Sequence, residues 1–251
     1  MKKNIYAFLF VALIGLSTLQ AAQTSIWARH ELDFQSSSEY LNPLYDVRSF
    51  AVKFHSPSGR IHLVNGFWDG GLSWKVRFCP DEKGEWKWES RCSDQDNSGL
   101  HGQSGVFTVG DNEDPAGIYQ RGQIVRSPGN YHLCHSDGTP FFWLACTAWN
   151  GAMRSTEEEW DRYLSDRKEK GFSVIQFVTT QWRGLEVDRN GEQAFSGCGR
   201  IEINPSFFQS LDERVDQINA HGLVAAPVLL WALPRGQGRE LSPGYYLPEN
   251  E

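Results

Sequence analysis

Aromatic and amide side chains stand side by side where apolar runs of the sequence end. Trp149 and Asn150 follow the first run, Gln181 and Trp182 follow the second, and Trp231 closes the third. An indole face can stack on the apolar face of a sugar ring, while an amide can hydrogen-bond sugar hydroxyls. We therefore take these five residues as candidates for substrate binding. In the other interpretation the tryptophans fill a core and the amides make cap or turn contacts.

Carboxyl groups are less well placed for chemistry. Glycoside hydrolysis needs two of them, about 5 Å apart for retention or about 6.5–9.5 Å apart for inversion. Glu186 and Asp188 lie in the loop after the second run, and Glu240 lies beyond the third. Acids in loops are more often solvated surface groups, so we assign no catalytic residue.

The histidines lack an H-E-x-x-H pattern and the cysteines lack C-x-x-C, so the sequence indicates no metal and no cofactor.

The runs before these residues have the pattern of a parallel β-sheet. Residues 142–146 are uninterrupted and apolar, which is typical of a strand covered on both faces. Two further strands are predicted over 172–178 and 223–231. Strands that alternate with helical segments indicate a repeating β/α unit.

Residues that typically begin and end helices lie between these predicted strands. Ser155 with Glu158 forms a capping-box pattern before the first helix, and Gly171 ends that helix. Asn204 followed by proline opens the second helix, and Gly222 ends it.

In the N-terminal part of the sequence, apolar residues recur with the period of β-strands. Over residues 26–110, aromatic and charged residues alternate with a period of two, and turn signals separate the runs. Several short strands in this length favour an immunoglobulin-like β-sandwich. We expect Trp74, Trp86 and Trp88 in its core, whereas Trp68, in a glycine-rich turn, packs there or faces the following domain.

Charge and targeting signals limit the partners. The formal net charge is −7, with no basic run, which argues against nucleic acid as a partner. Residues 1–22 read as a signal peptide, with two lysines, a short apolar core and small residues for cleavage. No later run reaches the length of a membrane span. We therefore expect a secreted or periplasmic protein.

Its five cysteines are an odd number, and we favour free thiols over disulfides.

The motifs resemble two known domains. Residues 65–71, followed by 74–78 and 84–88, resemble an N-terminal immunoglobulin-like domain found on secreted bacterial glycosidases. Residues 137–144, with 147–150 and 170–176, resemble the start of the apiosidase-like glycoside hydrolase barrel. The resemblance implies a sandwich followed by a TIM-type β/α barrel, and hydrolysis of a glycosidic bond in plant-type polysaccharide or oligosaccharide.

The length of the chain shows how much of such a barrel to expect. We expect a linker over 111–130 and about three β/α units of the barrel over 131–251, because a whole barrel needs about 250 residues. The resemblance places the catalytic carboxylates on later strands, so the chain is expected to be an N-terminal portion that is inactive alone. The alternative is a non-catalytic secreted protein that binds carbohydrate or attaches to a surface.

Overall fold

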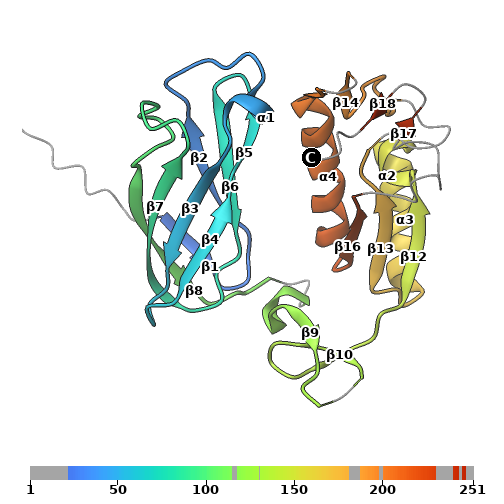
Figure 1. Cartoon of the computed structure of the whole chain (residues 1–251). Helices are drawn as coiled ribbons and strands as arrows, with labels where there is room; N and C mark the ends of the chain where they lie inside the picture. The colour runs from blue at the N-terminus through green and yellow to red at the C-terminus, as the bar shows by residue number, and fades with distance from the viewer. Residues whose placement is uncertain are drawn as a thin grey trace, which may run out of the picture.

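The computed structural model describes residues 22–114, 118–129, 131–180, 187–197, 200–229, 240–242 and 245–246. Its strands form an N-terminal body of two sheets and a C-terminal body built on a parallel sheet. Helix α4 (Pro205–Ala220) lies between the two bodies (Figure 1).

The N-terminal body consists of two sheets and one short helix. The first sheet has the order β1-β8-β7-β3-β4, with β1 (Ala22–Ser25), β8 (Ser104–Gly110), β7 (Gly84–Cys92), β3 (Phe50–His55) and β4 (Ile61–Asn65). The second has the order β2-β6-β5, with β2 (His30–Gln35), β6 (Ser73–Phe78) and β5 (Phe67–Gly70). Helix α1 (Pro43–Asp46) lies in the connection between β2 and β3.

Aromatic side chains from both sheets meet in one core. Phe54 of the first sheet stacks on Phe78 of the second, with ring centroids 4.2 Å apart. Trp74 and Trp86 are buried in the same cluster, and Trp88 packs against it, which confirms their expected place in the core. Trp68 packs against this cluster too. The period of two puts these side chains on one face of each strand.

A small antiparallel sheet connects the bodies. It has the order β11-β10-β9, with β9 (Ile124–Arg126), β10 (Leu133–His135) and β11 (Pro140–Phe141). Strands β10 and β11 pair as an antiparallel hairpin. The segment 111–130, expected as a linker, carries the 3-10 helix η1 (Ile118–Arg121) and β9, which pairs with β10.

The C-terminal body has the expected alternation of parallel strands and helices. The parallel sheet has the order β12-β13-β16, with β12 (Ala145–Trp149), β13 (Val174–Val178) and β16 (Val224–Val228). Helices α2 (Gly151–Arg154) and α3 (Glu157–Glu169) follow β12. Strands β14 (Phe195–Ser196) and β15 (Glu202–Ile203) form a hairpin before α4, and β17 (Glu240–Ser242) pairs with β18 (Tyr245–Tyr246).

Several boundaries differ from the sequence prediction. Strand β13 begins at Val174 rather than at residue 172, and β16 covers 224–228 rather than 223–231. The first strand lies at 145–149 rather than 142–146, and Phe142 is 78 % exposed, so the apolar run belongs mainly to the connection before β12. Helix α3 is capped by Thr156, which accepts from the amide of Glu159, and not by Ser155. The Ser155 hydroxyl instead donates to the carbonyl of Gly151, at the end of α2.

The other helix ends are as predicted. The Asn204 side chain accepts from the amide of Ser206 at the start of α4, with proline at its first position. Gly171 and Gly222 follow α3 and α4 with φ of 77° and 67°, a conformation that glycine adopts without strain. Cys79, Cys92, Cys134 and Cys146 are free thiols, as favoured, while Cys198 lies outside the described residues.

Helix α4 contacts both bodies through opposite sides. Phe207 and Ile218 are buried in clusters of the C-terminal body. Asp212 accepts two hydrogen bonds from Arg77 of β6, at 2.9 and 2.6 Å. One turn later, Asp216 accepts two from Arg29, at 2.9 and 3.0 Å. Paired guanidinium–carboxylate bonds fix orientation as well as distance, so they hold α4 in register with the N-terminal body.

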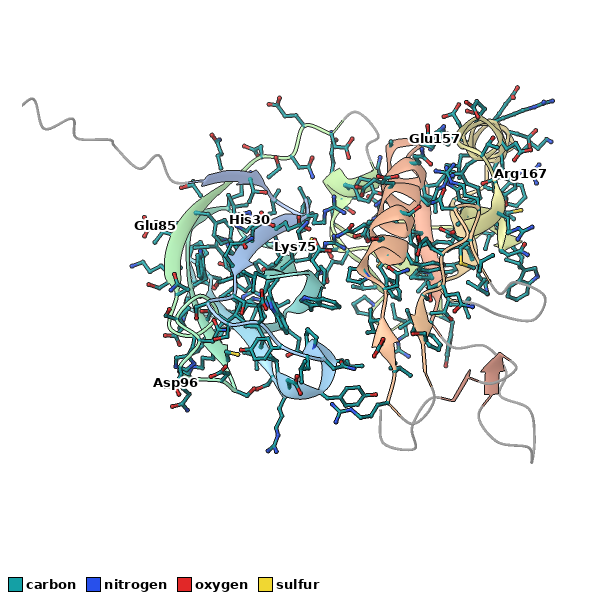
Figure 2. The ribbon with its side chains drawn as sticks, turned by 90° about the horizontal axis from the view of Figure 1, so that it is seen from above. His30, Lys75, Glu85, Asp96, Glu157 and Arg167 are labelled. Carbon is teal, nitrogen blue, oxygen red and sulfur yellow. The ribbon has the colours of Figure 1, made fainter. Side chains whose placement is uncertain are left out.

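The pair at Arg77 belongs to a larger ionic network. Arg77 Nε donates to Glu31 at 2.6 Å, and Lys75 lies 3.2 Å from Glu31 and 3.1 Å from Asp69. Figure 2 shows Lys75 on the side of the N-terminal body that faces α4, whereas Glu85 lies on the far side. Burial disfavours the charge on Arg77, but its bonds to Asp212 and Glu31 outweigh this effect and raise its pKa.

Removing the guanidinium should loosen the junction. Arg77→Met leaves the partly buried carboxylates of Glu31 and Asp212 without their main partner. We expect a loss of about 2 kcal/mol in the free energy of unfolding, between the values for exposed and buried ion pairs. Urea denaturation measures this loss. Lys87→Met is the control, because Lys87 pairs with Glu85 in solvent at 3.8 Å. Equal effects of the two substitutions would contradict the role of Arg77.

The contribution of this network should also depend on pH. Burial opposes ionisation of Glu31, but the hydrogen bonds and charges of Arg77 and Lys75 outweigh it, so its pKa lies below the ordinary 4.5. A carboxylate with a lowered folded-state pKa stabilises the fold above its unfolded-state pKa, and this contribution is lost as pH falls through the folded-state value. In urea titrations, the difference between wild type and Glu31→Gln should shrink as pH falls below 4.5. A difference that stays constant would contradict this assignment.

Candidate functional site

The carboxyl ends of the three parallel strands lie side by side. In the pairing of β13 with β16, Val178 stands opposite Val228, and the hydroxyl of Thr179 donates to the carbonyl of Val228 at 3.1 Å. Binding and catalytic residues of β/α folds gather at this end of the strands. This end is therefore where the candidate residues from the sequence have to be sought.

Trp149 is the last residue of β12 and has an unusual backbone conformation. Its φ is +42°, and the pairing with β13 shifts register between Thr147 and Trp149. Such a conformation is uncommon for a bulky side chain and collects at functional sites. The indole is half-buried and packs against a cluster that includes Val178, Phe195 and Phe207. Trp149 thus stands at the predicted strand end, partly covered by its own core.

Asn150 follows directly and is exposed. Its main-chain carbonyl accepts from the amides of Met153 and Arg154, which starts helix α2. Its side chain makes no cap hydrogen bond. The amide group at the end of β12 is therefore open to solvent beside Trp149.

Gln181, Trp182 and Trp231 lie outside the described residues, and so does Glu186. Of the five binding residues predicted from the sequence, the described strand ends bring together Trp149 and Asn150.

Asp188 is a buried turn residue and not the solvated acid that its loop position suggested. It is 6 % exposed. One carboxylate oxygen accepts from the amides of Asn190 and Glu192, at 2.8 and 2.9 Å. Carboxylates that accept local amides in this way stabilise turns. Asp188 therefore holds the connection between β13 and β14.

Two acids that sequence analysis passed over lie at this same end. Glu192 and Glu202 line a cavity of about 460 Å³ in the connection that runs from β13 to α4. Glu192 accepts from the side chain of Asn204 at 2.6 Å and so supports the cap of α4. Glu202 is exposed on β15. They are ten residues apart in the sequence, and both line the cavity beside the β14–β15 hairpin, so no motif indicated them.

The described residues contain no group of three or more histidine, cysteine or acidic side chains that could hold a metal ion. Among the same residues, no helix combines the length and apolar character needed to cross a bilayer.

The role of Asp188 can be tested by substitution. Asp188→Ala removes the acceptor of two partly buried hydrogen bonds from main-chain amides, and we expect a loss of about 1–3 kcal/mol in the free energy of unfolding. Thermal or urea denaturation measures it. Glu169→Ala, at an exposed position near the end of α3, is the control and should change stability by less than about 0.5 kcal/mol. A stable Asp188→Ala variant would contradict the turn assignment.

Comparison with protein families divides the chain into two parts. Residues 127–250 match the model of the apiosidase-like catalytic domain. Residues 23–93 match a domain of unknown function, DUF5060. Among the curated proteins none matches the chain.

Solved structures give a concordant result. One, described as a putative glycoside hydrolase from Bacteroides vulgatus, is 26 % identical with a TM-score of 0.66, over 83 % of this chain and 41 % of that one. A family 5 glycoside hydrolase from the same species is 21 % identical over 44 % of this chain and 25 % of that one, with a TM-score of 0.39. The chain thus spans less than half the length of the structures that it matches. The comparisons confirm the resemblance of this chain to apiosidase-like glycoside hydrolases.

Proposed function

We propose that this protein is an exported glycoside hydrolase that acts on plant-type polysaccharide or oligosaccharide. The observation that carries the proposal is the placement of Trp149 and Asn150 at a parallel strand end, within the part that matches the apiosidase-like catalytic domain. A half-buried indole beside an exposed amide can stack on a sugar ring and hydrogen-bond its hydroxyls.

The fold that we propose for the whole protein is an immunoglobulin-like sandwich followed by a TIM-type barrel. Two sheets around one core support the first part. The three parallel strands with their intervening helices support the second, as the first units of a barrel. In that fold Gln181, Trp182 and Trp231 follow barrel strands and would join Trp149 around the substrate.

We place the catalytic carboxylate pair on barrel strands outside these 251 residues. The matched structure of a glycoside hydrolase is more than twice as long as the region that it shares with this chain. Asp188, the first described acid after β13 in the sequence, is already engaged by backbone amides. The described part of the chain would then supply substrate contacts rather than the acid and base.

Export is proposed from the sequence. Two lysines, a short apolar core and the small residues of positions 21–22 are typical of a signal peptide. An exported enzyme meets polymers that do not enter the cell, which agrees with a substrate of plant-type polysaccharide.

Binding and hydrolysis test this function separately. Trp149→Ala in the mature chain should weaken binding of a xylan- or pectin-derived oligosaccharide about tenfold in calorimetry, as expected for an aromatic anchor. Trp143→Ala is the control, because Trp143 is exposed before the amino end of β12. The mature chain alone should not hydrolyse the glycan, and the complete gene product should.

Three results would contradict parts of the proposal. Turnover by the mature chain that Glu186→Gln or Asp188→Asn abolishes would put the catalytic acids in this chain. Binding without hydrolysis by the complete gene product would favour a carbohydrate-binding protein. Equal affinity of wild type and Trp149→Ala would remove Trp149 from the site.

A further inference from the structure

A second hollow lies at the junction of the two bodies, on the side of β5, β6 and the α1 connection. Its volume is about 440 Å³, within the roughly 300–1,000 Å³ of ligand pockets. Trp68, Trp74, Asn65 and Arg48 of the N-terminal body contribute to its wall, and Ile203 of β15 contributes from the C-terminal body. We call this hollow the junction cleft.

Trp74 lines the junction cleft and carries an unused hydrogen-bond donor. Its side chain is 4 % exposed, and its indole Nε1 has no hydrogen-bond partner in the described part of the chain. The other buried core indole of this body, Trp86, donates to the carbonyl of Glu82 at 2.9 Å. Buried donors are almost always paired, so an orphaned one on a residue of a cavity wall points to an acceptor that the described part of the chain does not provide.

Trp68 supplies a rigid apolar face next to this donor. It stands opposite Trp74 in the pairing of β5 with β6, so the two side chains lie on the same face of the sheet. Its Nε1 donates to the carbonyl of Gly71 at 2.9 Å, which fixes the indole within its own turn. A half-buried, fixed indole can stack on a sugar ring without losing much conformational freedom on binding.

Polar groups complete the wall. Arg48 and Asn65 are both exposed, and neither side chain forms a hydrogen bond or ion pair with another described residue. A guanidinium provides several donors, and an amide provides both donors and an acceptor. An aromatic face combined with such groups suits a polyhydroxylated ring better than an apolar ligand.

Ile203 connects the junction cleft to the cluster at the strand ends of the C-terminal body. Ile203 lines the cleft and also packs in the same cluster as Trp149. Tyr45 of α1 joins this cluster, and its hydroxyl accepts from the amide of Ile201 at 2.9 Å. Asn42 donates to the carbonyl of Ile201 at 2.9 Å. These contacts hold the α1 connection against the β14–β15 hairpin.

We propose that the junction cleft is a carbohydrate subsite, in which the N-terminal body holds a further sugar ring of the glycan bound at the strand ends. Trp68 stacks on that ring, and the Trp74 indole N–H donates to one of its hydroxyls. The inference rests on the proposed function, and it assigns to the N-terminal body a direct part in substrate binding.

The test measures affinity with the mature chain and oligosaccharides of two to six residues from partial hydrolysis of xylan, arabinan and pectin. Trp68→Ala should weaken binding of the longer oligosaccharides about tenfold and leave that of disaccharides unchanged. Trp74→Phe keeps a ring in the core but removes the N–H, and should weaken the same oligosaccharides about fivefold. Trp88→Phe, the same change at a core position away from the junction cleft, should have no effect on affinity.

A spectroscopic measurement separates binding from folding. In the 1H–15N spectrum, the Trp74 indole signal is the one that Trp74→Phe removes, and it should shift when a longer oligosaccharide is added. If an oligosaccharide binds the wild type but neither variant loses affinity and this signal stays in place, the junction cleft is not a subsite and the proposed function stands. If none of the oligosaccharides binds the wild type, the proposed function fails and this inference fails with it.

Discussion

Helix α4 is the element on which the arrangement of this protein depends, because it is shared by both bodies. Its apolar side, with Phe207 and Ile218, packs in the C-terminal clusters. Its acidic side is fixed by bidentate hydrogen bonds from Arg77 to Asp212 and, one turn later, from Arg29 to Asp216. Side chains four residues apart on a helix share a face, so two such pairs set both the rotation and the height of the helix against the N-terminal sheets. Figure 1 shows the resulting layers, with α4 between the sheets of the two bodies.

Much of the fold follows from local patterns, and the part that does not follow is the junction. Periodic alternation and helix caps depend on neighbours in the sequence, which is why Asn204 could be predicted as a cap. The error at α3 has a local cause, since Ser155 and Thr156 are both followed by glutamate three residues later. The structure uses the first hydroxyl at the end of α2 and the second at the start of α3. In contrast, Arg77 and Asp212 are 135 residues apart, and no period or motif links two such charges.

The candidate site shows the same division. Trp149 and Asn150 could be placed because they follow the apolar run that leads into β12, and parallel strands end at one edge. Glu192 and Glu202 could not, because a hairpin brings them to one cavity. The unpaired N–H of Trp74 could not be predicted either. In the sequence Trp74 alternates with charged residues as a core residue does, and only the atoms around it in the structure show that an acceptor is missing. Sequence therefore indicated where sugar could bind, and three-dimensional contacts added how the N-terminal body would take part.

In the proposed function, glycan binds across the carboxyl ends of the parallel strands, at the edge where the N-terminal body meets them. The most direct measurement is a crystal structure of the mature chain with a xylan- or pectin-derived hexasaccharide bound. We expect one sugar ring against Trp149 and Asn150, with the chain of rings continuing toward Trp68. A hexasaccharide bound elsewhere on the molecule, with the strand ends and the junction cleft both free of sugar, would contradict it.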